Sequence, residues 1–262
     1  MNILDKIFTA RKIAVDAAKA NADHAMLFAA AKTIRQNKQS NRFSSALRDD
    51  SRTNIIAEFK RRSPSKGIIN ATLDAAETAK LYEKNGAAAM SVLTEEEHFG
   101  GSLNDLIAAR EACDLPLLRK DFIFDRFQII EAANAGADAI LLIAAMLTDE
   151  QINDLKEFAE NEFGIEVLLE VHNEQEMERA LVADAKLIGV NNRNLSTFEV
   201  SLDVSRRLIK YRRDEIIFVA ESGISNAAEI HELRELGFNG FLIGETLMRS
   251  SDPAAELEKL TR

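Results

Sequence analysis

The sequence passes eight times from an apolar run of strand length to an amphipathic helical pattern, beginning at residue 54. The predicted strands lie at 54–60, 88–93, 115–120, 139–144, 166–171, 187–192, 216–221 and 240–244. The predicted helices lie at about 73–85, 102–113, 126–135, 148–163, 173–184, 200–212 and 226–236, with a last one from 252. Across residues 54–262, one strand and helix pair averages about 26 residues, which is the length of one βα unit.

Glycines end the helical patterns at regular intervals. Gly86, Gly136 and Gly237 each stand just before a predicted strand, and their separations of 50 and 101 residues are close to two and four units. Ser102 and Thr148 are suited to cap the helices that follow them. Eight parallel strands alternating with helices predict an α/β fold, a (β/α)8 TIM barrel. The competing architecture is an open doubly wound sheet, but its first strand would be followed by a glycine-rich turn, which is absent here.

Residues 1–53 stand outside this repeat. We expect them to form an N-terminal helical extension that packs on the barrel of residues 54–262, the two making a single domain. One apolar helical face is marked by Ile3, Leu4, Ile7, Phe8, Ala14, Val15 and Ala18. A second helix is expected to include 25–34, before a polar break at 35–41. The extension is expected to close one end of the barrel; a lid that contacts substrate is the alternative.

Composition excludes several classes of function. The formal net charge of −10 disfavours binding to nucleic acid, and no apolar run of 18 residues predicts a membrane span. Charged residues near the N-terminus argue against a signal peptide. The single cysteine, Cys113, excludes an internal disulfide and fits a reducing compartment, so we expect a cytoplasmic protein. The four histidines are scattered without metal-ligand spacing, and we expect no metal and no histidine nucleophile.

Polar residues gather at the carboxyl ends of the predicted strands, where barrel enzymes build their active sites. Glu58 and Lys60 are two residues apart in the first strand, so their side chains face the same way. If Leu118, Leu168 and Gly189 face inward, the same alternation turns four more polar side chains inward: Lys120, Glu170, Asn191 and Arg193. Acids and bases at one mouth suit acid–base catalysis. The alternative for any one of them is a structural ion pair.

Two turns and one loop could meet an anion. Ser222 and Gly223 follow the seventh strand, Gly244 and Glu245 follow the eighth, and backbone N–H groups at two such turns can converge on a phosphate. Ordinary turn glycines are the alternative. The Glu245 side chain would have to point away and contribute only its amide. The loop from Lys60 onward carries four cations by residue 66, which also suits an anionic ligand.

Eight motifs in order across residues 54–248 resemble those of the indole-3-glycerol phosphate synthase family. They are residues 56–67, 99–102, 118–123, 135–143, 169–172, 189–195, 221–224 and 242–244. The first runs Ile56-Ala57-Glu58-Phe59-Lys60-Arg61-Arg62-Ser63-Pro64-Ser65-Lys66-Gly67. The first 50 residues match only loosely, and Glu245 departs from the serine of many members.

The resemblance implies a lyase of tryptophan biosynthesis that needs no cofactor. Its reaction closes a ring in 1-(2-carboxyphenylamino)-1-deoxyribulose 5-phosphate and releases CO₂ and water to give indole-3-glycerol phosphate. Lys120 would polarise the substrate ketone, and Glu170 would act as the base. Lys60 and Glu58 would form a second acid–base pair, with the division of work between the two lysines left open.

The same resemblance implies binding roles for other residues. Asn191, also counted as catalytic, and Arg193 would orient the ribulose hydroxyls and the developing charge, and Ser63 would lie near the carboxylate of the aromatic ring. The phosphate would be held mainly by backbone amides of Ser222, Gly223, Gly244 and Glu245.

Two other functions fit the same residues. Two lysines at one mouth could serve a Schiff-base aldolase, in which an amine of lowered pKa attacks a carbonyl. A noncatalytic sensor of phosphorylated ligands is the second. The expected partner is a phosphorylated small molecule, with no nucleic acid and no membrane. We expect a monomer that could associate with other tryptophan-pathway enzymes, although the sequence does not settle the oligomeric state.

Overall fold

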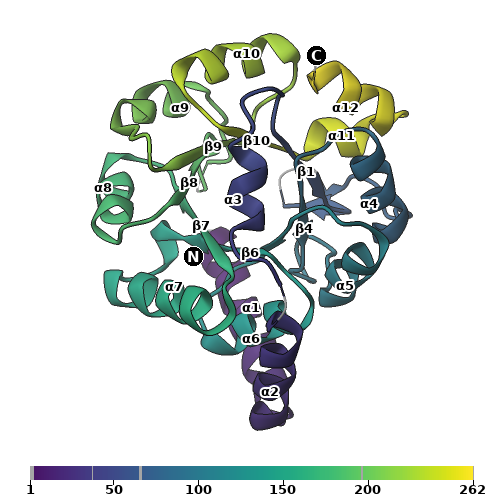
Figure 1. Cartoon of the computed structure of the whole chain (residues 1–262), viewed down its shortest axis with the longest axis vertical. Coiled ribbons are helices and arrows are strands. Elements are labelled where there is room, and N and C mark those ends of the chain that lie inside the picture. The colour runs from purple at the N-terminus through teal and green to yellow at the C-terminus, as the bar shows by residue number, and fades with distance from the viewer. Residues whose placement is uncertain (1–2, 37, 65–66, 196, 262) are drawn as a thin grey trace.

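The computed structural model describes residues 3–36, 38–64, 67–195 and 197–261. Eight parallel strands form a closed barrel in the order β1-β10-β9-β8-β7-β6-β5-β4, with helices around it (Figure 1). The strands are β1 (Ile55–Phe59), β4 (Ala89–Leu93), β5 (Leu117–Lys120), β6 (Ala139–Ile143), β7 (Glu166–Val171), β8 (Leu187–Asn191), β9 (Ile217–Glu221) and β10 (Gly240–Ile243). Each lies within its predicted range, and the predicted (β/α)8 fold is confirmed.

The outer helices also follow the prediction. They are α4 (Ala75–Lys84), α5 (Leu103–Ala112), α6 (Arg126–Asn134), α7 (Asp149–Phe163), α8 (Glu174–Val182), α9 (Asp203–Leu208), α10 (Ala227–Leu236) and α12 (Pro253–Thr261). Ser102 and Thr148 cap α5 and α7 as predicted, each accepting a hydrogen bond from the backbone N–H three residues later. Among the described residues, no helix combines the length and the apolar character needed to span a membrane.

Several short elements were not predicted. The helix expected at 200–212 is shorter, because α9 passes into the 3-10 turn η2 (Ile209–Tyr211), and a second such turn, η1 (Ala144–Met146), follows β6. A five-residue helix, α11 (Glu245–Arg249), follows β10 directly, and a small hairpin of β2 (Arg62–Ser63) and β3 (Gly67–Ile68) follows β1. Segments this short hold too few residues to show a period.

The apolar side chains form two layers separated by the barrel wall. The inner cluster fills the barrel, and its strand residues include Ile56, Leu118, Leu168, Val219 and Leu242. The outer cluster packs between the strands and the helices. Because side chains alternate along a strand, residues two positions beyond the inner ones also face the barrel interior, at its carboxyl-terminal mouth.

The amino-terminal end of the barrel is closed by α3 (Arg42–Leu47), which lies across the barrel axis in Figure 1. Phe43 and Leu47 are fully buried in the inner cluster. The first amides of α3 are fixed by the Glu166 carboxylate, which accepts hydrogen bonds from Phe43 N at 2.8 Å and Ser44 N at 3.1 Å. The helix at this end of the barrel is thus α3, which lies beyond both predicted helices.

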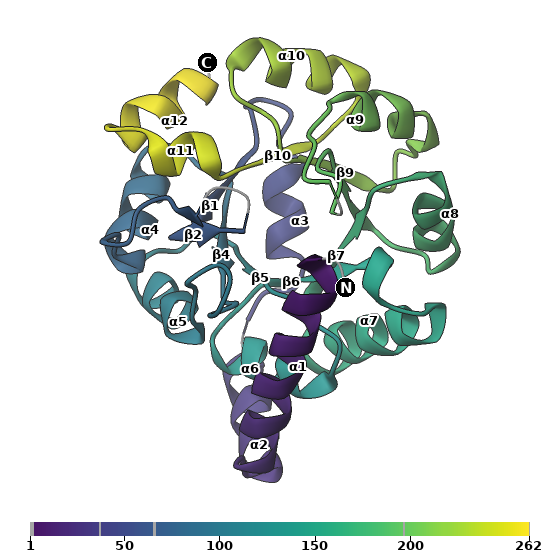
Figure 2. The same cartoon turned by 180° about the vertical axis from the view of Figure 1, so that it is seen from behind.

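The first helix, α1 (Ile3–Ala20), lies over the opposite end, where Figure 2 shows its N-terminal end above the barrel mouth. Arg11 holds it there through a 2.6 Å ion pair with the fully buried Asp121 carboxylate on the β5 rim. Phe8 packs edge-on against Phe124, with ring centroids 5.0 Å apart. The position of α1 favours the lid alternative over a closing helix.

The second helix, α2 (His24–Arg35), packs against α6 and α7. Arg35, expected in a polar break, instead ends this helix and is only 7% exposed. Its guanidinium donates hydrogen bonds to three backbone carbonyls, those of Phe163, Ala137 and Gly164. The side chain thus ties the extension to the barrel, because a buried guanidinium needs acceptors for its donors.

Candidate active site

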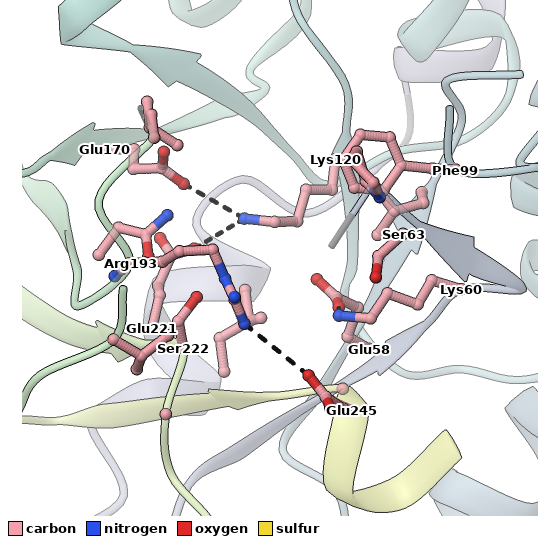
Figure 3. A pocket seen from close by; sticks show the side chains of 18 of the residues that line it. Glu58, Lys60, Ser63, Phe99, Lys120, Glu170, Arg193, Glu221, Ser222 and Glu245 are labelled. Atoms are coloured by element: carbon pink, nitrogen blue, oxygen red, sulfur yellow. Dashed lines mark hydrogen bonds and ion pairs between the residues drawn. The ribbon is translucent and has the colours of Figure 1, made fainter. Parts of the chain in front are cut away.

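A pocket of about 810 Å³ opens at the carboxyl-terminal mouth of the barrel. Its walls include every residue that the sequence analysis assigned to a site: Glu58, Lys60, Ser63, Lys120, Glu170, Asn191, Arg193, Ser222, Gly223, Gly244 and Glu245. Figure 3 shows ten of the lining side chains labelled, with the carboxylates and ammonium groups pointing toward one another. Residues far apart in the chain meet here because each follows or ends a parallel strand.

Lys120, at the end of β5, lies between two carboxylates. Its Nζ is 2.7 Å from Glu221 Oε2 and 3.4 Å from Glu170 Oε2 (Figure 3). Burial alone would lower the pKa of Lys120, but the negative charges of Glu221, Glu170 and Glu58 outweigh it and raise the pKa above its ordinary value. The amine is therefore a protonated ammonium at neutral pH.

Glu221 ends β9 and was not assigned a role in the sequence analysis. The signal was available, because Val219 faces the barrel interior and alternation turns Glu221 to the same side. Burial raises the pKa of Glu221 to about 7, with Lys120 opposing and Glu170 adding to the rise. Gly189 leaves room for this carboxylate, since a Cβ there would lie 2.1 Å from Glu221 Oε1.

Glu170, at the end of β7, is the first member of a chain of alternating charges. His172 Nε2 lies 3.2 Å from Glu170 Oε1, and His172 Nδ1 lies 3.0 Å from Glu176 Oε2. Burial would lower the pKa of His172, but hydrogen bonds and charges from both carboxylates raise it to about 10, so the ring is an imidazolium. Although burial favours a neutral carboxyl, Lys120 and His172 hold the pKa of Glu170 below its ordinary value. Glu170 is therefore ionised.

A second acid–base pair lies on β1. Lys60 Nζ is 2.5 Å from Glu58 Oε1, with the two side chains 16% and 4% exposed. Gly244 was expected to let a phosphate approach, and the structure gives it a further role. A Cβ at Gly244 would lie 2.2 Å from Glu58 Oε1, so the missing side chain leaves room for the Glu58 carboxylate.

The turn after β9 has an unusual backbone. Ser222 has a φ of 61° and Gly223 a φ of 82°, two successive residues in the left-handed region. Gly223 is required there, since a Cβ would lie 2.4 Å from Val200 Cγ1 in addition to the backbone strain. Left-handed φ in a non-glycine residue such as Ser222 costs about 1–3 kcal/mol and is typical of functional sites.

Asn191 ends β8, and Arg193 follows it. Asn191 Oδ1 accepts a hydrogen bond from Arg193 N at 3.0 Å, which fixes the start of the loop. The Arg193 guanidinium reaches across the pocket to Glu245, with 3.8 Å between Nη2 and Oε2. Glu245 was expected to point away from a bound phosphate. In the structure, attraction to Arg193 and to Arg249, whose Nη1 is 3.3 Å from Oε1, holds the Glu245 carboxylate at the pocket wall.

The basic loop after β1 contributes less to the pocket than its charge indicated. Arg61 turns toward α5 and forms a bidentate ion pair with Asp105 at 2.6 and 2.7 Å. Arg62 is exposed and is not part of the pocket wall, and Lys66 lies outside the described residues. Among the described residues of this loop, Lys60 and Ser63 face the pocket with polar side chains.

An apolar wall lies beside the charged groups, and its α1 part corresponds to the lid that the sequence analysis gave as an alternative. It consists of Ile3, Leu4 and Ile7 from α1 together with Phe99 and Phe122 from the loops after β4 and β5. The two phenylalanine rings have centroids 6.0 Å apart. A pocket with charged groups on one side and aromatic rings on the other suits a ligand that carries both an aromatic ring and anionic groups.

Solved structures share the fold. The structure titled "3-hexulose-6-phosphate synthase from Salmonella typhimurium" matches with a TM-score of 0.63 at 17% identity, over 79% of this chain and 96% of that one. The thiamine phosphate pyrophosphorylase from Pyrococcus furiosus matches with a TM-score of 0.59 at 18% identity, over 79% of this chain and 93% of that one. At these identities the likeness concerns the barrel alone.

Sequence comparison is more specific. The family profile described as "Indole-3-glycerol phosphate synthase" matches residues 4–260. Proteins of that name from Desulfosudis oleivorans and Laribacter hongkongensis are 43% and 44% identical, each over 99% of this chain and 98% of the relative. One from Dehalococcoides mccartyi is 49% identical over 79% of this chain and 80% of its own length. The chain therefore belongs to the indole-3-glycerol phosphate synthase family.

Proposed function

We propose that this pocket catalyses the reaction for which the family is named, in tryptophan biosynthesis. The substrate, 1-(2-carboxyphenylamino)-1-deoxyribulose 5-phosphate, carries an aromatic carboxylate at one end and a phosphate at the other. The observation that carries the proposal is the position of Lys120, held as an ammonium between Glu170 and Glu221 beside the apolar wall. An acid and a base within one polar cluster can serve successive proton transfers.

The first step is ring closure with Lys120 as the acid. The aromatic carbon that bears the carboxylate attacks the ketone carbon, a C–C bond forms, and the ketone oxygen takes a proton from the Lys120 ammonium. The raised pKa of Lys120 keeps that proton available at neutral pH. The C–C bond to the carboxylate then breaks, CO₂ leaves, and the electron pair restores the aromatic ring.

The second step is dehydration with Glu170 as the base. The new hydroxyl leaves as water after it is protonated, while a base removes a proton from the neighbouring carbon that is bonded to nitrogen. Glu170 can take this role because its carboxylate is ionised and lines the pocket. Lys60 and Glu58, 2.5 Å apart, form the second acid–base pair. Glu221 is the natural partner for returning a proton to Lys120, from which it lies 2.7 Å away.

The other lining residues are assigned to the parts of the substrate that they would contact. We assign Asn191 and Arg193 to the ribulose hydroxyls and Ser63 to the carboxylate of the aromatic ring, which the apolar wall would hold. The phosphate would lie against the turns after β9 and β10, where the backbone amides of Ser222, Gly223, Gly244 and Glu245 are the donors. The successive left-handed residues at the first turn support this, because such turns aim adjacent N–H groups at one anion.

The same proposal covers the wider organisation of the protein. Residues 1–53 would extend a barrel domain of residues 54–262 and form one catalytic unit with it, since α1 lines the pocket. We propose a monomer acting in the cytoplasm, where a buried free thiol such as Cys113 is stable, with association with other enzymes of the pathway left to experiment.

A Schiff-base aldolase is disfavoured, because it needs an amine of lowered pKa, whereas the pKa of Lys120 is raised.

The experiment mixes the purified protein with the carboxyphenylamino ribulose phosphate and records indole fluorescence and CO₂ release. We expect product from the wild-type protein and a loss of about a hundred- to ten-thousand-fold in turnover for Glu170→Ala. Lys80→Ala, an exposed site on α4, is the matched control and should retain activity. Absence of indole product, or a borohydride-trapped lysine adduct with a keto-sugar phosphate, would contradict the proposal.

A further inference from the structure

The Glu245 carboxylate occupies the end of the pocket to which we assign the phosphate. Glu245 is the first residue of α11, directly after Gly244, and its side chain lines the pocket with 31% exposure. Two cations flank it, with Arg193 Nη2 at 3.8 Å and Arg249 Nη1 at 3.3 Å. Figure 3 shows the carboxylate pointing toward Arg193 across the pocket.

In the proposed function, the substrate phosphate and the Glu245 carboxylate place like charges side by side. A phosphate monoester that reaches the backbone amides of Ser222, Gly223 and Gly244 brings up to two negative charges beside the Glu245 carboxylate. Two adjacent negative charges repel each other, and solvent and salt screen this repulsion only partly in a half-buried pocket. At the same time, Arg193 and Arg249 both line this pocket and are the natural partners of a phosphate.

We propose that Glu245 is a built-in counter-ion that the phosphate of the substrate displaces from Arg193 and Arg249. In the ligand-free pocket the carboxylate neutralises the two guanidinium groups. When a phosphate monoester binds, it takes over these cations, and the Glu245 side chain rotates toward solvent. Glu245 is thus an affinity-setting residue, which weakens binding of phosphate and keeps the arginines from retaining adventitious anions. This inference rests on the proposed phosphate site.

The inference distinguishes Glu245 from the other carboxylates of the pocket. Glu58, Glu170 and Glu221 are nearly fully buried and pair with lysines in the barrel interior. Glu245 pairs with arginines at the rim, where its side chain can move without leaving a buried charge unpaired. Its removal should therefore change anion affinity without the loss of packing expected for an interior residue.

The test compares wild-type protein with Glu245→Gln, using inorganic phosphate as the probe. Phosphate binding is measured directly by calorimetric titration and also as competitive inhibition of turnover. We expect Glu245→Gln to bind phosphate about two- to fivefold more tightly, the size of one partly screened charge interaction. KM for the phosphorylated substrate should fall by a similar factor, and added salt should narrow the difference. Glu256→Gln, which removes a partly exposed carboxylate on α12 outside the pocket, should change neither value.

A second variant tests the role of the arginines. Arg249→Gln removes one of the two cations, so phosphate should bind more weakly than to the wild-type protein. Unchanged or weaker phosphate binding by Glu245→Gln would overturn the counter-ion role. If phosphate binds neither protein, the phosphate site and this inference both fail, while formation of indole by the wild-type protein would show that the proposed reaction stands.

Discussion

The two ends of the barrel both carry dense charge, but they use it differently. At the amino-terminal end, Asp138 accepts hydrogen bonds from Arg42 at 3.2 Å, Arg110 at 3.0 Å and the Leu117 amide at 3.0 Å, and α3 covers the barrel axis beside them. At the carboxyl-terminal end, the charged groups face a cavity of about 810 Å³. Closed networks stabilise the fold, whereas groups that face a cavity remain available to a ligand.

The buried carboxylates at the two ends also differ in how completely they are hydrogen-bonded. At the mouth, Glu221 Oε1 is buried and has no hydrogen-bond partner among the described residues. The carboxylates of Asp138 and Glu166 at the other end each accept at least two hydrogen bonds. Incomplete satisfaction of buried polar groups costs stability, and proteins keep it where function requires it. The comparison predicts that mutations at the mouth affect activity, and mutations at the closed end affect stability.

The sharpest test at the mouth is Lys120→Ala. We expect turnover to fall by about a hundred- to ten-thousand-fold, because the ammonium that protonates the ketone is lost. The fold should persist, because Glu221, whose pKa is about 7, can take up a proton when its cation is removed. Steady-state fluorescence kinetics and thermal unfolding measure the two effects. Near wild-type turnover would break the comparison.

The matching test at the closed end is Asp138→Ala. The side chain is 1% exposed, and its loss leaves Arg42 and Arg110 without their shared carboxylate. Removal of one partner from a buried ion pair costs about 3–5 kcal/mol of unfolding free energy. Urea unfolding measures this cost, and turnover per folded molecule should stay near that of the wild-type protein. A variant with wild-type stability and impaired turnover would reverse the assignment of the two ends.

The strands and mouth residues could be predicted from the sequence because apolar runs recur once in each βα unit and side chains alternate within each strand. Strands buried on both faces appear as apolar runs, and alternation from inward residues such as Leu118 and Leu168 identifies Lys120 and Glu170. The same rule applied to Val219 would have identified Glu221. The small residues that follow Glu221 are typical of a turn, and that signal hides the inward direction of its side chain.

Other features depend on contacts that no local pattern contains. Phe43, which is buried under the amino-terminal end of the barrel, belongs to the six-residue helix α3, and this helix is too short to show a hydrophobic period. The orientation of Glu245 is set by Arg193, which is 52 positions earlier in the chain. Gly244 makes room for the Glu58 side chain on a strand at the other end of the barrel sequence. The pair of Gly244 and Glu58 forms because the barrel closes with β10 beside β1.

The pH dependence of the mouth can be tested with His172→Asn. In the wild-type protein the imidazolium helps to keep the pKa of Glu170 low, so its removal should raise that pKa. We expect the acidic limb of the kcat/KM profile to move upward by about 1 pH unit or more. His231→Asn, on the exposed face of α10, is the control and should leave the profile unchanged.

The same variant carries a stability prediction whose sign is opposite to that of a carboxylate. The folded pKa of His172 is raised from 6.5 to about 10, so its contribution to stability is complete below pH 6.5. That contribution is lost as the pH rises through about 10. The stability difference between wild-type protein and His172→Asn should therefore be largest in acid and should shrink toward pH 10. A difference that grows with pH would refute the imidazolium.

The smallest expected effect concerns α1, the part of the extension that lies over the mouth. Leu4 lines the pocket, whereas Ile13 on the same helix is 67% exposed. Leu4→Ala removes part of the wall proposed to hold the aromatic ring and should raise KM about two- to tenfold, given about 0.8 kcal/mol for each buried CH₂. Ile13→Ala should leave KM unchanged. A KM unaffected by Leu4→Ala would mean that α1 covers the mouth without contacting substrate. The helices α1 and α3 would then both serve only to cover an end of the barrel, and the two ends would differ only in how their charged groups are used.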